Sequence, residues 1–191
     1  ILSLLTAISY DPDDLIAWRA VQAIGVAARV IAIKDPEYVR VHLRRLNWLV
    51  NDESGGIGWR APEAIGEIIY QCPGQFDEFI SPLFHFLDME QEDALRFRPG
   101  VLWAIGRVGR GCHSNPGHPS AILPVLHLIL DCLKDPQAQI RGLALWCLDQ
   151  VDYAGTIPGL QALCSDQEPV LLYWDGVLQS WTVARLARRF C

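Results

Sequence analysis

The sequence predicts an all-α protein in which about five helical hairpins form one domain over residues 1–191. Two observations lead to this prediction. A related segment of twelve residues recurs along the chain, and its apolar residues keep the spacing of one helix face. Half of the residues are hydrophobic and a fifth are charged, which is an ordinary globular composition with enough length for a substantial core.

The recurring segment begins at residues 16, 57, 97, 140 and 173. Its first three copies share the string Ala-Ile-Gly, and the same five positions are apolar in each of the first four copies. An acidic residue stands five positions before every copy, where a helix start favours it. The pattern therefore predicts the second helix of each hairpin near 13–32, 55–71, 93–110, 137–153 and 169–189.

Amphipathic stretches between these segments predict the first helix of each hairpin. They cover residues 38–50, 76–87, 121–133 and 157–163, and residues 1–8 look like the end of another helix. The fifth copy of the repeat is looser, as expected of a terminal repeat. No segment was found to alternate like a strand beside a hairpin turn, so no sheet is predicted.

The Ala-Ile-Gly strings and the acidic-proline turns, such as Asp11-Pro12 and Asp135-Pro136, resemble HEAT repeats. In their short form they are similar to the bacterial HEAT-like repeats named after phycobilisome lyases. This resemblance implies a right-handed α-α superhelix, a HEAT-like solenoid with the second helices on the concave side, which commonly binds. It predicts fold more than function, because HEAT repeats serve many roles.

The helix face opposite the apolar positions carries an unusual mixture of side chains. Four of the seven tryptophans fall on or beside it, together with arginine and glutamate. Such residues are enriched in recognition surfaces. The candidate binding residues on this face and its flanks are Trp18, Trp59, Glu63, Glu67, Arg98, Trp103, Arg107, Arg110, Arg141, Trp146, Gln150 and Tyr153. Three interpretations stay open: a binding groove, tryptophans packed between adjacent helices, and a homodimer contact.

Glu63 and Glu67 stand one turn apart, and this spacing allows more than one role. The two carboxylates could share a proton or a cation. More often such a pair is solvated or matched by an arginine, here Arg60 or Arg107.

Gly55 and Gly56 stand where the second repeat helix should begin, although glycine there costs up to ~1 kcal/mol each. A tight backbone turn against the neighbouring repeat would explain them. A ligand whose anionic group meets free N–H groups at the helix start is the second explanation. The third is that Ser54 simply caps the helix.

Cys112, His113 and His118 lie in a loop of Gly, Pro, Ser and Asn between repeats three and four. They lack the four donors at recognised spacing that a zinc site usually has. No nucleophile motif, P-loop or dinucleotide fingerprint occurs. We therefore predict no catalytic residue, no metal and no cofactor.

The net charge of −6 disfavours a nucleic-acid partner, because such proteins need excess lysine and arginine. None of the six cysteines forms a CxxC pair, and several lie within apolar helical stretches, where cysteine acts as a small hydrophobe. We therefore expect a reducing cytoplasm. No apolar run approaches the ~20 residues of a membrane helix, so no membrane contact is predicted.

A non-enzymatic scaffold that binds a protein or peptide in the concave groove is the predicted function. The resemblance implies an alternative, a lyase-like protein that handles a tetrapyrrole or another planar anion through Arg107 and Arg110. A HEAT protein of the alkyl-purine DNA glycosylase type is the third and least favoured hypothesis.

Overall fold

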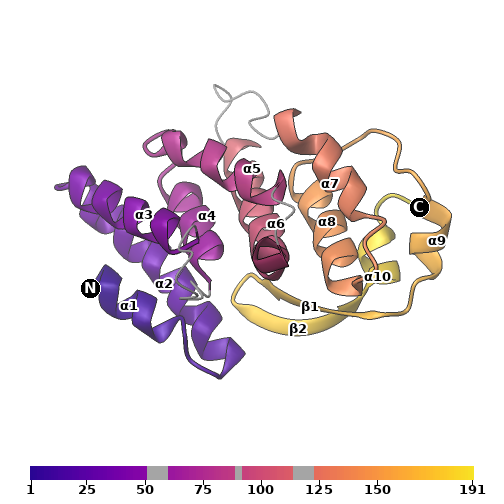
Figure 1. The fold of residues 1–191 in the computed structure, drawn as a ribbon, viewed down its shortest axis with the longest axis horizontal. Helices are drawn as coiled ribbons and strands as arrows, with labels where there is room; N and C mark the ends of the chain where they lie inside the picture. Colours follow the sequence, from indigo (N-terminus) through magenta and orange to yellow (C-terminus); the bar gives the residue numbers. More distant parts are fainter. Residues whose placement is uncertain (51–59, 89–91, 114–122) are drawn as a thin grey trace.

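The structure is a computed structural model that describes residues 1–50, 60–88, 92–113 and 123–191, without the side chains of residues 92–95 and 112–113. It is mostly helical, with one small antiparallel sheet (Figure 1). The α-helices are α1 (Leu2–Ile8), α2 (Asp14–Ala32), α3 (Pro36–Val50), α4 (Ala61–Gln71), α5 (Ile80–Asp88), α6 (Glu92–His113), α7 (Leu126–Cys132), α8 (Ala138–Gln150), α9 (Leu160–Ser165) and α10 (Val183–Ala187). The strands are β1 (Pro169–Trp174) and β2 (Val177–Thr182), and two short 3-10 turns cover Asp77–Phe79 and Leu123–Val125.

Helices α2, α4, α6 and α8 form a row in which each helix contacts the next. Helices α3, α5 and α7 pack along one side of this row, so the chain alternates between the two layers (Figure 1). The predicted ranges 13–32, 93–110 and 137–153 coincide with α2, α6 and α8, and α4 begins at Ala61 within the range 55–71. Gly55, Gly56 and Trp59 lie outside the described residues.

The glycine of each Ala-Ile-Gly string lies at a contact between neighbouring helices of the row. A Cβ atom added at Gly25 would lie 2.6 Å from Cγ of Glu67 on α4. At Gly66 it would lie 2.6 Å from the Cα of Ala104 on α6, and at Gly106 it would lie 2.6 Å from the ring of Trp146 on α8. The repeated glycine therefore allows the close approach of successive helices, which any side chain would prevent.

Helix α2 is long and apolar enough to cross a membrane when only length and composition are considered. One side of it is nevertheless buried in the protein, through residues such as Val21, Ile24 and Ala28. Core helices of folded domains pass the same test of length and composition. The hydropathy of α2 is thus accounted for by its place at the start of the helix row.

The predicted helix over 169–189 is wrong, because this segment forms a β-hairpin followed by the five-residue helix α10. Trp174 pairs with Val177 around a two-residue turn in which Asp175 and Gly176 both have positive φ, 48° and 81°. These are the dihedrals of the hairpin turn that Asp-Gly favours. The Asp-Gly dipeptide between aromatic and branched residues favours this hairpin, but the alignment of the repeats assigned the segment to a helix.

The expectation of reduced cysteines is corrected for two of the six. Cys164 at the end of α9 and Cys191 at the chain terminus form a disulfide, with the hairpin and α10 between them in sequence. Cys72, Cys132 and Cys147 are free and buried, and burial raises the pKa of the Cys72 and Cys132 thiols to about 11. These three thiols act as small core hydrophobes.

Replacing Gly66 with alanine should lower the free energy of unfolding by about 1–3 kcal/mol, because the new Cβ meets the α6 backbone. Urea unfolding followed by circular dichroism measures this change. Gly111→Ala is the matched control, since its Cβ would meet the ring of Tyr70 at 3.3 Å and the substitution should stay within about 0.5 kcal/mol. A Gly66→Ala protein as stable as the wild type would refute the close contact.

Cys191→Ser should lower the free energy of unfolding by about 3 kcal/mol, as expected when a loop of 27 residues is no longer closed. Urea unfolding with and without dithiothreitol measures it. The reductant should bring the wild type down to the stability of the variant and should leave the variant unchanged. No effect of the reductant on the wild type would contradict the disulfide.

Candidate functional site

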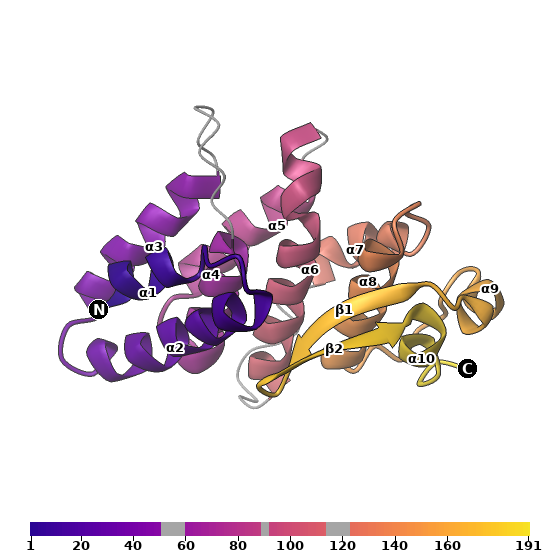
Figure 2. The same cartoon turned by 90° about the horizontal axis from the view of Figure 1, so that it is seen from below.

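The hairpin covers the side of the helix row that faces away from α3, α5 and α7 (Figure 2). Strand β1 contacts α8, and β2 contacts α2. Three tryptophans among the candidate binding residues lie beneath it, since Trp18 is 6%, Trp103 3% and Trp146 1% exposed. This face is therefore part of the protein core.

An aromatic row joins the helices to the hairpin. The Trp18 ring stacks on Tyr173 of β1, with centroids 5.0 Å apart and an interplanar angle of 6°. Trp103 lies between Trp18 and Trp146, with centroid distances of 4.7 Å and 6.0 Å. Of the interpretations left open by the sequence, packing of the tryptophans between helices of the row is the one that the structure matches, and the hairpin adds to this packing.

Polar contacts fix the hairpin in this position. The indole N–H of Trp103 donates a hydrogen bond of 2.8 Å to the carbonyl of Tyr173, whose hydroxyl donates one of 2.8 Å to Gln22. Near the turn, Arg19 donates to the carbonyl of Gly176, and Arg110 pairs with Asp175 at 3.3 Å. The predicted binding residues Trp103 and Arg110 thus bind a segment of their own chain.

Of the roles left open for Glu63 and Glu67, pairing with an arginine is the one that the structure shows. Arg107 donates two hydrogen bonds to Glu67, at 2.8 and 3.1 Å, and Glu67 is only 1% exposed. The guanidinium of Arg107 also lies 3.7 Å from the ring centre of Tyr70. Arg60 pairs with Glu63 at 3.2 Å. Because Arg107 is held by Glu67 and Tyr70, it is not placed to receive a planar anion.

The other predicted site residues stabilise turns and helix ends. Arg98 pairs with Asp135 at 3.6 Å, and Arg141 pairs with Asp166 at 2.6 Å. Gln150 is buried and donates to Asp149, and the Tyr153 hydroxyl donates to the carbonyl of Thr156.

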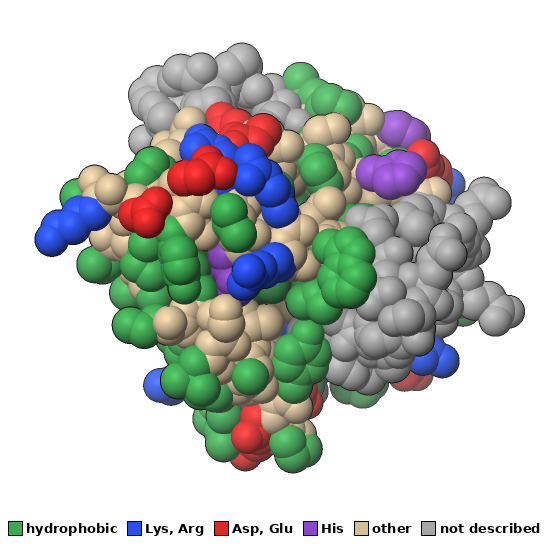
Figure 3. Space-filling model, turned by 60° about the vertical axis from the view of Figure 1, so that its left-hand side comes forward, with side chains coloured by type: hydrophobic (Ala, Val, Ile, Leu, Met, Phe, Trp, Pro, Cys, Tyr) green, Lys and Arg blue, Asp and Glu red, His purple; other side chains and the backbone are tan. Residues whose placement is uncertain are grey.

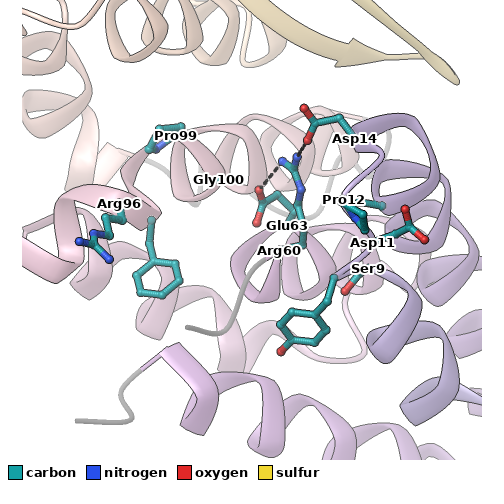
Figure 4. A pocket seen from close by; sticks show the side chains of 12 residues that line it. Ser9, Asp11, Pro12, Asp14, Arg60, Glu63, Arg96, Pro99 and Gly100 are labelled. Carbon is teal, nitrogen blue, oxygen red and sulfur yellow. Dashed lines mark hydrogen bonds and ion pairs between the residues drawn. The ribbon is translucent and has the colours of Figure 1, made fainter. Parts of the chain in front are cut away.

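A pocket of about 360 Å³ lies between the turn that links α1 to α2, the start of α4 and the first half of α6 (Figure 4). Three separate stretches of the chain form it. Its lining residues are Ser9, Tyr10, Asp11, Pro12, Asp14, Ala17, Arg60, Glu63, Arg96, Phe97, Pro99 and Gly100. Its volume is at the lower end of the range for small-molecule sites.

Arg60 links two of the chain segments that line this pocket. It precedes α4 in a left-handed conformation, with φ of 63°. Its guanidinium donates to Asp14 at 2.6 Å and to Glu63 at 3.2 Å, and it lies 4.4 Å from the ring centre of Trp18 (Figure 4). The side chain of Arg60 therefore connects α2 to α4 while its charge is shared by two carboxylates.

Glu63 is a buried carboxylate at the pocket, since the residue is 5% exposed. Burial raises the pKa of Glu63, and the charge and hydrogen bond of Arg60 oppose this effect. Gly100 makes room for the carboxylate, because an added Cβ atom would lie 2.6 Å from both of its oxygens. Sequence analysis singled out Glu63 but missed Tyr10, Phe97 and Gly100, which only the fold brings beside it.

Within the described part of the chain, no group of three or more His, Cys, Asp or Glu side chains is placed to share a metal ion. The hypothesis about Cys112, His113 and His118 lies outside the described side chains.

Replacing Arg107 with methionine should lower the free energy of unfolding by about 3 kcal/mol, because it leaves Glu67 buried without its partner. The double variant Arg107→Met with Glu67→Gln should recover part of this loss in a urea-unfolding cycle. Arg44→Met is the control, since it breaks an exposed pair with Glu37 and should cost less than about 1 kcal/mol. Strict additivity of the two changes would contradict the coupling.

Comparison with known proteins places the fold in context. No known family profile matches the chain. An uncharacterized protein of Archaeoglobus fulgidus is 30% identical over 117 residues, which are 60% of this chain and 58% of that relative. The chain thus matches little more than half of the relative's length.

A designed armadillo repeat protein in complex with the peptide (KR)4 has a similar fold. Its TM-score is 0.50 at 18% identity, over 87% of this chain and 75% of the designed one. The fold of this protein is therefore that of a helical-repeat protein of armadillo-like type.

Proposed function

We propose that this protein is a non-enzymatic helical-repeat scaffold that binds a protein partner through the exposed apolar surface of α1, α2 and α3. The observation that carries the proposal is the distribution of exposed hydrophobic side chains. Among the described residues, most exposed large hydrophobic side chains fall within the first 48 residues, and the others are Leu123, Leu171 and Val177. Figure 3 shows hydrophobic side chains, interspersed with polar and charged ones, on the side of the molecule where α1, α2 and α3 lie. A concentration of exposed apolar side chains in one region favours an interaction site there.

A groove of about 500 Å³ runs along α2 within this surface. Ala23, Val26, Ala27 and Val30 line it at the spacing of one helix face, and Val30 is 61% exposed. Alanine at two of these four positions allows another helix to approach closely, while the valines fill the grooves of its surface. The partner that fits this groove is a protein segment that presents an apolar helix face.

The same contact chemistry holds the repeats together. Ile140 on α8 is fully buried, whereas Ile16, its counterpart at the start of the first repeat, is 45% exposed. Helix α2 thus exposes at Ile16 an apolar position that is covered in the fourth repeat. The designed armadillo repeat protein supports the proposal, because its complex with a peptide is an example of partner binding by this fold.

We further infer that the repeats are of the short HEAT-like type and form a right-handed superhelix. The Ala-Ile-Gly strings and the acidic-proline turns support this assignment. The scaffold, tetrapyrrole and DNA hypotheses all placed binding on an open concave face with free aromatic and arginine side chains. The buried Trp103 and the Arg107–Glu67 pair argue against binding there, so the scaffold is retained with its partner surface on α1, α2 and α3 instead.

The test is to identify a partner by affinity capture with the wild type, and then to measure its affinity as a purified protein by calorimetry. Val26→Asp combined with Val30→Asp should weaken binding at least 100-fold, because both charges would be buried beneath the partner. Val177→Asp is the matched control on the hairpin, where Val177 is 54% exposed, and it should leave the affinity unchanged.

Two outcomes would overturn this function. One is a purified partner that binds the Val26→Asp, Val30→Asp variant as tightly as the wild type. The other is light scattering that shows a dimer which the same variant dissociates, because the occupant of the groove would then be a second copy of this chain.

A further inference from the structure

The pocket beside Glu63 lies apart from the surface of the proposed partner groove and has a different chemistry. Its lining combines carboxylates, two arginines and the two aromatic side chains Tyr10 and Phe97. The partner groove, in contrast, is almost entirely apolar. A function of this pocket can therefore be tested without reference to a protein partner.

The charged side chains of the pocket leave a surplus of negative charge. Asp11, Asp14 and Glu63 stand against Arg60 and Arg96. Arg60 is already shared between Asp14 and Glu63, so it is not placed to receive an anion. Arg96 is exposed, and its guanidinium points away from the pair of Arg60 and Glu63 (Figure 4). The net field inside the pocket thus favours a positive charge.

Glu63 has hydrogen-bonding capacity beyond its contact with Arg60. An ionised carboxylate can accept about four hydrogen bonds. In the described part of the chain, Arg60 is the side-chain donor to Glu63, through one Nη atom at 3.2 Å. A donor on a ligand would find the remaining lone pairs at the buried end of the pocket. The absence of a side chain at Gly100 keeps the carboxylate in this position.

Burial makes the ionised form of the Glu63 carboxylate unfavourable for the stability of the folded protein. The pKa of Glu63 is raised, so the ionised form is less favourable in the folded protein than in the unfolded chain, even with Arg60 beside it. Because the pKa of Glu63 is higher in the folded protein than in the unfolded chain, the free energy of unfolding falls as the pH rises from the unfolded pKa through the folded pKa. A neutral residue would avoid the loss, and a bound cation would compensate for it.

Two aromatic side chains complete the set of groups that recognise organic cations. Tyr10 and Phe97 come from different elements and both line the pocket. The faces of aromatic rings attract ammonium and guanidinium groups, and the attraction is stronger when the groups are desolvated. A buried carboxylate can pair with the charge of such a ligand, and aromatic walls can pack against its alkyl part.

We propose that this pocket binds an organic cation, an alkylammonium or alkylguanidinium group, with Glu63 as its counter-ion and Tyr10 and Phe97 as its aromatic walls. The group can belong to a small molecule or to a lysine or arginine side chain of a protein. Both sources share the same chemistry at Glu63. They differ in whether a peptide backbone follows the cation out of the pocket.

The experiment is calorimetric titration of the whole chain at pH 7 with n-butylguanidinium, n-butylammonium and the neutral n-butylurea. At least one cation should bind at least tenfold more tightly than n-butylurea. Glu63→Gln should lower the affinity for that cation at least tenfold, and Gly100→Ala should lower it as well, because its Cβ displaces the carboxylate. Glu37→Gln is the matched control, since Glu37 is an exposed carboxylate that also pairs with arginine, and it should not change the affinity.

Equal binding of the cations and n-butylurea would overturn the proposal. So would a Glu63→Gln variant that binds as well as the wild type, or a Glu37→Gln variant that loses as much affinity as Glu63→Gln. If Glu63→Gln fails to fold by circular dichroism, Phe97→Ala must lower the affinity for the cation, and unchanged affinity would reject the site. A capped Gly-Arg-Gly peptide that binds more tightly than n-butylguanidinium identifies a protein side chain as the source, and weaker binding identifies a small molecule.

Discussion

The close packing of α2, α4, α6 and α8 is the constraint on which the rest of the structure depends. Glycine at one position of three successive repeats allows each helix to contact the next at backbone distance. This spacing sets where the side chains of one helix meet those of another. It places Glu67 against Gly25 and Trp146 against Gly106, so the ion pairs and the aromatic row both follow from it.

The hairpin changes what the helix row can do. In a solenoid, the face of the second helices is usually available to a partner. Here β1 and β2 cover that face, and Trp18 and Trp103 contact Tyr173 instead of solvent. The hairpin thereby covers this face of the row from α8 to α2. The exposed apolar side chains remain on α1, α2 and α3, which is why the proposed partner surface lies there.

Two glutamates one turn apart on α4 have different surroundings. Glu67 is held by two hydrogen bonds from Arg107 and lines a cavity of only about 30 Å³. Glu63 shares Arg60 with Asp14 and lines a pocket. Because the burial of a carboxylate is unfavourable without full compensation, the first pair is a structural feature, whereas the second supports binding of a cation.

The sequence by itself determined the repeat and the apolar face of its helices, because both depend on spacing along one helix. It also offered Arg60 and Arg107 as partners of Glu63 and Glu67, but the contact between Arg107 on α6 and Glu67 on α4 depends on how the two helices pack. Tertiary structure decided the rest. In the segment YWDGVLQSW, the spacing of apolar residues fits either a helix or a hairpin. The Asp-Gly turn favours the hairpin, and the hairpin packs against α2 and α8. The exposure of Trp18, Trp103 and Trp146 depended on that outcome. The pocket beside Glu63 could not be predicted from the sequence either. Tyr10, Glu63 and Phe97 come from distant parts of the chain, and only the packing of α2, α4 and α6 brings them together.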